Sequence, residues 1–196
     1  MDDMAAKQDT TTEGDHLATR LRTEREARGW SIGDLAARSG VSRAMISKVE
    51  RNEASPTAAL LGRLSGAFGL TLSTLLARSE TDATGDGRVA RAAEQVRWTD
   101  LATGYVRRAI SPPGATPELV QVDLPPGARI DYPKSAFTFL RGQCVWVLSG
   151  VLEFNEGALA HRLRRGDCLT LGPPSDCSFA NPSAATLCVY LVALTR

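Results

Sequence analysis

The stretch LAARSGVSRAMISKVERNEASPT, residues 35–57, decides how the N-terminal part of the chain folds. Ser31 and Ser42 each precede a run with helical apolar spacing, and serine is a preferred N-cap residue. Asp34 follows Ser31 by three positions, which is a capping-box spacing. Gly40 lies between the two runs and tolerates the left-handed backbone of a sharp turn. The pattern therefore predicts two short helices joined by a turn.

Helical signals continue on both sides of this pair. An earlier helix is expected to end at Gly29, and Asn52 is the expected terminator of the second helix of the pair. The letters SPT at 55–57 begin a fourth helix, and a short fifth helix over 72–76 closes the core. Residues 15–76 are therefore predicted to form an all-α domain of five helices.

Two short helices joined by a glycine turn form a helix-turn-helix, whose second helix fits the major groove of DNA. Over residues 15–76 the sequence resembles the XRE (phage-repressor-like) helix-turn-helix family, and residues 35–57 carry the closest match. The resemblance implies that the helix after the GVS turn contacts DNA. The DNA-binding residues that it implies are Ser42, Arg43, Ala44, Met45, Ser47 and Lys48.

The chemistry of these side chains suits particular roles on DNA. Arg43 is expected to read guanine O6 and N7, and Ala44 to touch a thymine methyl group. Ser42 is expected to bond a phosphate, and Lys48 to bind a base or a phosphate. The family often has a phosphate-binding glutamine where this chain has Ile32, so Ile32 is expected to pack on a neighbouring apolar side chain instead.

The charge balance limits what kind of DNA binding is possible. The 196 residues include 23 Lys+Arg and 22 Asp+Glu, a net charge of +1, which excludes non-specific coating of nucleic acid through bulk charge. Residues 15–76 alone hold nine basic and six acidic residues, and the face bearing Arg43, Ser47 and Lys48 has no acidic residue until Glu50. The alternative is a helical bundle whose arginines are only solvated.

A single helix-turn-helix makes too few contacts for tight specific binding. We therefore expect a homodimer that binds two inverted half-sites in double-stranded DNA. Residues 1–14 are expected to be a disordered tail, and they lack the apolar stretch of a secretory signal. No run approaches the roughly 18 apolar residues of a membrane span, so we expect a cytoplasmic protein with no membrane partner.

The composition changes after the helical block. Residues 77–100 are charged at first and contain Gly and Thr, and are expected to be a linker. From residue 101 onward, Pro and Gly turns separate short β-branched runs, which suggests a closed sandwich or jelly roll. The predicted strands are 105–110, 119–124, 145–148, 151–154, 159–163, 168–171, 178–180 and 187–194.

Residues 101–196 resemble the cupin fold. The letters PPG at 125–127, VLSGVLEF at 147–154 and LRRGD at 163–167 carry the resemblance, and PP at 173–174 and NP at 181–182 complete it. The fold class is therefore multidomain α plus β. An all-α five-helix helix-turn-helix domain precedes an all-β cupin (double-stranded β-helix, jelly-roll) domain, which is expected to serve as sensor and dimerisation domain.

Cupins commonly bind a divalent metal through two His, one Glu and a further His. Here Gln143 takes the place of the Glu and Cys177 that of the last His. Phe137 and Phe139, or Ala136 and Thr138, occupy the His-x-His positions. One thiolate and one amide do not make a stable site, so we expect no metal, no cofactor and no cupin enzyme chemistry.

Without a metal, the resemblance implies a barrel mouth that could bind a small, partly apolar effector with one or two polar groups. The alternative is that Phe137 and Phe139 fill a closed core, because small barrels are often filled by side chains. A reactive Cys177 is disfavoured by the neighbouring Asp176. The candidate ligand-binding residues are Phe137, Phe139, Gln143 and Cys177 in the mouth, with Arg129, Tyr132 and Arg141 near the entrance.

The leading hypothesis is a dimeric transcriptional regulator whose cupin barrel binds a small effector without a metal. Two other functions stay open. One is a cupin enzyme, such as an isomerase or dioxygenase, fused to a DNA-binding domain. The other is a constitutive repressor whose barrel only dimerises.

Overall fold

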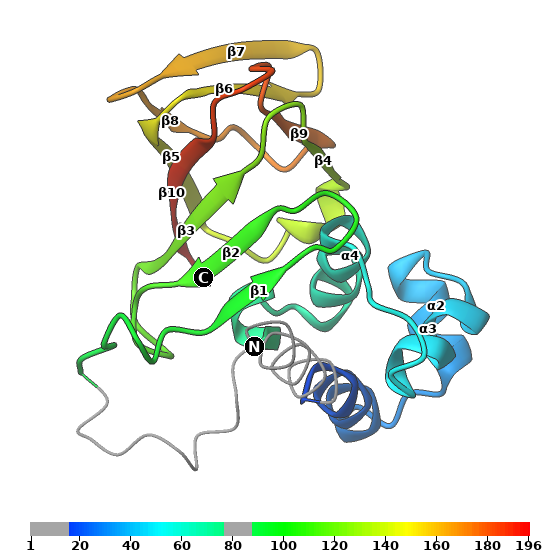
Figure 1. The fold of residues 1–196 in the computed structure, drawn as a ribbon. Helices are drawn as coiled ribbons and strands as arrows, with labels where there is room; N and C mark the ends of the chain where they lie inside the picture. The colour runs from blue at the N-terminus through cyan, green and yellow to red at the C-terminus, as the bar shows by residue number, and fades with distance from the viewer. Residues whose placement is uncertain (1–15, 77–87) are drawn as a thin grey trace, which may run out of the picture.

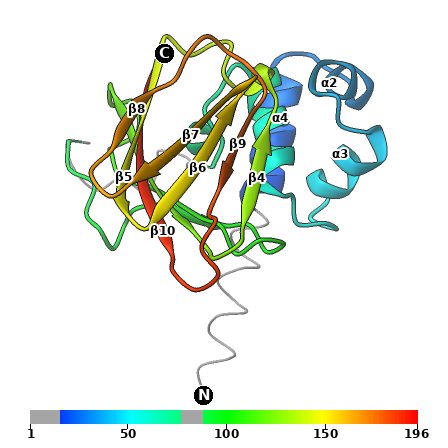
Figure 2. The same cartoon turned by 90° about the horizontal axis from the view of Figure 1, so that it is seen from above.

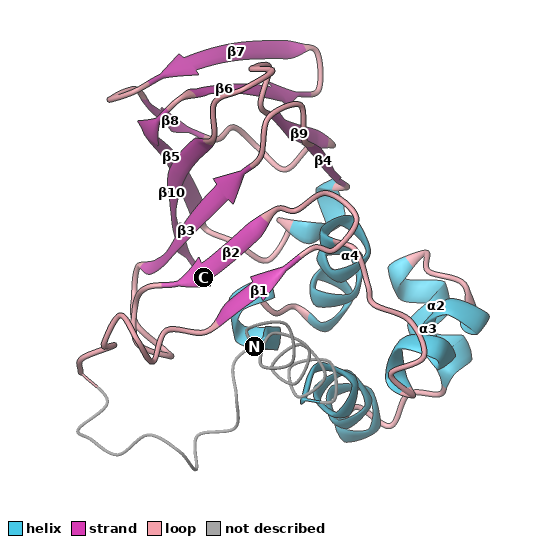
Figure 3. Cartoon of the chain, in the orientation of Figure 1, coloured by secondary structure: helices cyan, strands magenta, loops and turns pink. Residues whose placement is uncertain are grey.

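The computed structural model describes residues 16–76 and 88–196. Helices occupy the N-terminal part and strands the C-terminal part (Figure 3). The predicted tail over 1–14 and residues 77–87 of the predicted linker lie outside the described residues. Within the described ranges, no helix is long and apolar enough to cross a membrane.

The five predicted helices are present. They are a helix over residues 16–27, α2 (Ile32–Ser39), α3 (Arg43–Glu50), α4 (Ala58–Phe68) and α5 (Leu72–Leu76). Gly40 and Asn52, with φ of 67° and 55°, both have the left-handed backbone predicted for helix ends. Leu35, Ile46 and Leu61 from three of the helices are at most 1% exposed and form the core of the domain.

The strands form two antiparallel sheets that face each other as a barrel (Figure 1). The six-stranded sheet has the order β1 (Arg97–Thr99), β2 (Val106–Ala109), β3 (Glu118–Leu124), β10 (Cys188–Thr195), β5 (Gly142–Ser149) and β8 (Cys168–Thr170). The four-stranded sheet has the order β4 (Arg129–Tyr132), β9 (Cys177–Ala180), β6 (Val151–Glu156) and β7 (Leu159–Arg164).

Alternating side chains fill the space between the two sheets, as expected for strands with one buried face. In β3, Val120, Val122 and Leu124 point inward and are at most 1% exposed. Phe154 and Phe179 extend this core from the other sheet, with ring centroids 4.7 Å apart. The all-β part of the predicted fold class follows from this periodicity.

The strand predictions missed two short elements. All eight predicted runs overlap observed strands, but β1 and β4 were not predicted. Because β1 begins at Arg97, the sheet starts inside the segment expected to be a linker and not at residue 101. A short 3₁₀ helix, η2 (Lys134–Ala136), follows β4 and was also missed.

Helix α4 packs directly on the barrel. It lies between the strands and the α2–α3 pair in both views (Figures 1 and 2). Two glycines of α4 permit this close approach. A Cβ on Gly62 would lie 2.5 Å from the ring of Tyr132, and a Cβ on Gly66 would lie 2.5 Å from the carbonyl oxygen of Ser135.

Buried polar contacts also join the two domains. The carboxylate of Asp100 accepts a hydrogen bond from the Ala58 N–H at the start of α4 (2.9 Å). The hydroxyl of Thr71, before α5, donates to the Glu118 carboxylate on β3 (2.8 Å). The buried apolar side chains of both domains belong to one continuous core. The barrel therefore holds the helical domain through specific contacts as well as through the chain connection.

The α4 interface makes a prediction about stability. Gly66→Ala is expected to lower the free energy of unfolding by about 1–2 kcal/mol, because overpacking against backbone outweighs the better helix propensity of alanine. Gly33→Ala in α2 is the matched control, since the nearest atoms there belong to the flexible Arg43 side chain. That variant should be neutral or stabilising by up to about 1 kcal/mol in urea unfolding. A stabilised Gly66→Ala protein would contradict the prediction.

Candidate nucleic-acid interface and barrel cavities

Local hydrogen bonds define both helices of the helix-turn-helix. The Ser31 hydroxyl accepts from the Asp34 N–H (3.1 Å), and the Asp34 carboxylate accepts from the Ser31 N–H (2.8 Å). This is the predicted capping box. Ser42 caps α3 by accepting from the Met45 N–H (3.2 Å). The positions of both helices are therefore encoded close to their own termini.

A bidentate ion pair attaches α3 to the first helix. Arg25 Nε and Nη2 donate to the two carboxylate oxygens of Glu50 at 2.7 and 2.8 Å. The side chains of Arg25 and Glu50 are only 11% and 6% exposed, respectively. The hydrogen bonds to Glu50 raise the pKa of Arg25 above its usual value. Because Glu50 is committed to Arg25, the one carboxylate of α3 points inward.

The outer face of α3 is cationic and polar. Ser42, Arg43, Ala44 and Lys48 are exposed. Met45 is 36% exposed, which is high for an apolar side chain. Helix α3, which carries these side chains, lies on the side of α4 opposite to the barrel (Figure 2).

Two details change how individual predicted residues would meet DNA. Ser47 is partly buried, and its hydroxyl accepts a hydrogen bond from Arg51. The guanidinium of Arg43 lies over Gly33, where a Cβ would be 3.2 Å from Arg43 Nη2. Ile32 is partly buried against the core, as are Trp30 and Ala36, so its apolar side chain packs as expected.

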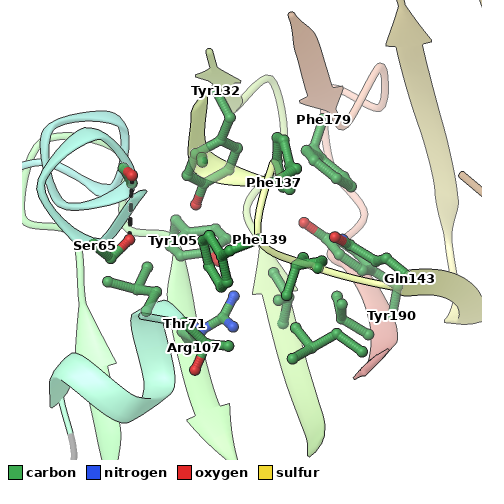
Figure 4. Close-up of a pocket in the computed structure, with 17 residues that line it drawn as sticks. Ser65, Thr71, Tyr105, Arg107, Tyr132, Phe137, Phe139, Gln143, Phe179 and Tyr190 are labelled. Carbon is green, nitrogen blue, oxygen red and sulfur yellow. Dashed lines mark hydrogen bonds between the residues drawn. The ribbon is translucent and has the colours of Figure 1, made fainter. Parts of the chain in front are cut away.

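The barrel contains two neighbouring cavities. The larger, of about 320 Å³, is bordered by Phe137, Arg141, Gln143 and Cys177, together with Glu156 and the loop over 171–175. The smaller, of about 50 Å³, lies between the barrel interior and helices α4 and α5 (Figure 4). The predicted residues Tyr132, Phe137, Phe139 and Gln143 border the smaller cavity. Phe137 and Gln143 belong to both.

One predicted entrance residue lies elsewhere. Arg129, on β4, is 54% exposed and pairs with Asp131 at 2.7 Å, so it lines neither cavity. The alternation along β4 turns Ile130 and Tyr132 inward and Arg129 outward. Within residues 16–76 and 88–196, no group of three or more His, Cys, Asp or Glu side chains is placed to hold a metal ion.

Cys177 is poorly suited to redox sensing. Burial, with Glu156, Asp176 and Asp131 nearby, raises the pKa of its thiol to about 12. The thiolate, which is the reactive form, is therefore a very small fraction at neutral pH. The described cysteines are all free thiols.

One charged side chain that borders the smaller cavity, Arg107, was not among the predicted site residues. Arg107 lies on β2, is 9% exposed and borders this cavity beside Tyr105. A signal was present, because Tyr105 and Arg107 are two positions apart and share one face of a strand. An arginine in a short run is usually solvated, whereas this one is buried where the barrel meets the helical domain and donates to Ser73 of α5.

Comparisons with known proteins match the helical domain. Residues 21–75 match the family model described as Helix-turn-helix (HTH_3). The HTH-type transcriptional regulator SutR of Escherichia coli (strain K12) is 43% identical over 60 residues. Those residues are 31% of this chain and 34% of SutR, so this chain matches about a third of the length of that relative.

Solved structures extend the comparison to the whole fold. The structure of an HTH_3 family transcriptional regulator from Vibrio cholerae has a TM-score of 0.76 at 18% identity, covering 94% of this chain and 97% of that chain. Fe(II) HppE gives 0.46 at 15% identity (92% and 98% covered). A Cupin_2 domain of an XRE family transcriptional regulator from Enterobacter cloacae gives 0.42 at 16% identity (47% and 96% covered). The last two scores are too low to support any conclusion about function.

The helical domain is a helix-turn-helix of the HTH_3 type, which confirms the resemblance to XRE regulators. The predicted fold class, five helices followed by an all-β domain of two antiparallel sheets, is confirmed by the topology and by the match to the fold of the Vibrio cholerae regulator.

Proposed function

We propose that this chain is a sequence-specific DNA-binding transcriptional regulator in which α3 reads the major groove and the barrel binds a small effector. The observation that carries the proposal is the outer face of α3. It presents Arg43 and Lys48 to solvent while Glu50 is neutralised by Arg25 on the inner side. DNA phosphates attract such a face, and it has no free carboxylate to repel them.

The roles follow from the positions of the side chains. Arg43 is a donor for guanine O6 and N7, and Ala44 and Met45 are apolar contacts for a thymine methyl. Lys48 binds a base or a phosphate. Ser42, whose oxygen caps α3, still has a hydroxyl hydrogen that can donate to a phosphate. Ser47 accepts a hydrogen bond from Arg51, whose guanidinium also pairs with Glu53, so Ser47 contributes by fixing the end of α3.

Affinity requires two copies of this surface. One helix-turn-helix buries too little surface and neutralises too few phosphates for nanomolar binding. We propose a homodimer on two inverted half-sites about one helical turn apart. An effector would act by binding differently to the DNA-competent and DNA-incompetent arrangements of the dimer.

The test uses the full-length protein and DNA selected by it from a random-sequence library. Arg43→Ala/Lys48→Ala should lower affinity for the selected DNA at least about tenfold and reduce the salt dependence of binding. The matched control is Arg129→Ala/Arg162→Ala, which removes two exposed barrel cations (54% and 60% exposed) and should bind as the parent protein does. Unchanged affinity in the α3 variant would disprove the assignment of α3, and failure to select any sequence would disprove the function.

We propose regulation in place of catalysis. By the resemblance to cupins, Gln143 and Cys177 take the positions of metal ligands without being the usual ligand set, and neither cavity brings three metal-binding side chains together within the described residues. Stoichiometric iron, nickel, manganese or zinc in the purified protein would favour the enzyme alternative. A barrel that binds no small molecule would favour the constitutive repressor.

A further inference from the structure

The cavity of about 50 Å³ lies at the junction of the two domains (Figure 4). Gly62 and Ser65 of α4, with Thr71 and Leu72 at the start of α5, form its helical wall. The barrel supplies the remaining wall, including Arg107 from β2. A molecule in this cavity would therefore touch both domains at once.

Arg107 is a buried cation that makes no ion pair within the described part of the chain, although the buried Glu118 lies near enough to help raise its pKa. Its side chain donates to the Ser73 hydroxyl of α5, at 3.2 Å from Nη2 and 3.4 Å from Nε, and the phenol of Tyr105 lies beside the guanidinium. Among the described residues, no carboxylate oxygen lies within 4.0 Å of its guanidinium, and Glu118 is bound to Thr71 and Arg196. A guanidinium offers five N–H donors, and leaving it buried without an anion is costly.

Two further polar atoms at this cavity lack partners. The hydroxyl of Tyr132 and Oε1 of Gln143 are buried and make no hydrogen bond within the described part of the chain. Gln143 is only 9% exposed. Figure 4 shows Tyr132 and Arg107 approaching the cavity from opposite sides. Unsatisfied buried polar atoms are rare in native proteins and often mark a site for a ligand or bound water.

The remaining walls are apolar, and the small volume limits the ligand to a short chain. Phe137, Phe139, Phe179 and Tyr190 border the cavity. A cavity needs at least about 10–15 Å³ of such volume for each water-sized group. A volume of about 50 Å³ therefore accommodates roughly three to five non-hydrogen atoms.

We propose that this cavity binds a short-chain carboxylate that carries a hydroxyl group. Arg107 takes the carboxylate, the Tyr132 hydroxyl donates to the same group, and Gln143 Oε1 accepts from the hydroxyl of the ligand. Each orphan polar atom thereby gains a partner of the right kind, and the charge of Arg107 is balanced. Glycolate, with five non-hydrogen atoms, is the smallest acid with this pattern and serves as the probe.

The binding also links the ligand to the helical domain, a step that rests on the proposed function. Nε and Nη2 of Arg107 hold Ser73 on α5, and a carboxylate bound to this guanidinium would compete for these N–H donors. Occupancy of the cavity therefore changes the contact between β2 and α5. Because α5 and α4 belong to the domain that carries α3, the two ligands, acid and DNA, become coupled.

Ligand binding is tested on the full-length protein without DNA, by titration calorimetry. Glycolate should bind at least tenfold more tightly than acetate, and uncharged ethylene glycol should not bind. Tyr132→Phe removes only an unbonded hydroxyl and should weaken glycolate binding at least threefold. Gln143→Leu should bind glycolate and acetate equally, and Arg107→Gln should lose both acids.

Two results would overturn the site. One is no heat of binding from 50 mM glycolate. The other is unchanged glycolate affinity in Tyr132→Phe and Gln143→Leu, both of which keep the fold testable if Arg107→Gln does not fold.

Coupling is tested separately with the selected DNA. Saturating glycolate should change the affinity of the parent protein for DNA at least threefold, and Ser73→Ala should bind glycolate but lose most of this effect. DNA binding that glycolate does not change would overturn the coupling. Failure of DNA binding itself would overturn the proposed function and leave the calorimetric result standing.

Discussion

Glu50→Ala is expected to lower the free energy of unfolding by about 3 kcal/mol. The variant leaves Arg25 with its guanidinium mostly buried and its two short hydrogen bonds removed. The remaining strong partner of Arg25 is the Trp30 carbonyl at 2.9 Å. We place the value at the low end of the range for buried pairs because Arg25 retains an edge that faces solvent. Urea unfolding, followed by circular dichroism, measures it.

The matched control is Glu53→Ala, which breaks an ion pair of the same chemistry. Arg51 and Glu53 also make two short contacts, but their side chains are 53% and 51% exposed. Water solvates both partners when the pair is broken, so a loss of only about 0–1 kcal/mol is expected. Equal losses for Glu50→Ala and Glu53→Ala would show that burial of the Arg25 pair contributes nothing.

Asp100→Ala is expected to destabilise the protein by about 3 kcal/mol and to loosen the helical domain from the barrel. Asp100 is 1% exposed, and its two carboxylate oxygens accept from the N–H groups of Ala58 (2.9 Å) and Ala102 (2.9 Å). Alanine leaves both donors without a partner, and one of them is the first residue of α4. Hydrogen exchange at the start of α4 should become faster than in the parent protein, together with a lower unfolding midpoint.

Two variants make this result interpretable. Asp100→Asn keeps a side-chain acceptor of the same shape and should cost clearly less than alanine. Asp131→Ala removes a carboxylate that is 65% exposed on the same domain and should change stability by less than about 0.5 kcal/mol. A stable Asp100→Ala protein with unchanged exchange at α4 would show that the Asp100 hydrogen bonds contribute nothing to holding the two domains together.

Much of the helical domain could be predicted because its signals are local. The capping box at Ser31, the cap at Ser42 and the left-handed residues Gly40 and Asn52 act within four positions of the helix ends that they define. Such contacts depend little on the rest of the chain. The strands with clear alternation were found for a similar reason, whereas β1 and β4, of three and four residues, are too short to show a period.

The candidate effector site could be predicted only in part. The cupin resemblance predicted that Phe137, Phe139 and Gln143 lie together in a barrel mouth. In the structure all three border the smaller cavity, as does Tyr132 of β4. The resemblance did not predict Arg107, because burial of that side chain depends on a helix of the other domain. It misplaced Arg129, because the expectation had no strand at β4 to fix which side chains point inward.

The sequence by itself determined the order and bounds of the helices, the face of α3 that carries Arg43 and Lys48, and the all-β character of the second domain. Each of these depends on spacing within a few residues. Only the tertiary structure decided that α4 packs on β4 through Gly62 and on η2 through Gly66, and that a cavity between the two domains is bordered by Arg107. Contacts between residues tens of positions apart depend on how closely two surfaces pack against each other. The periodicity of apolar residues along the chain does not predict that packing.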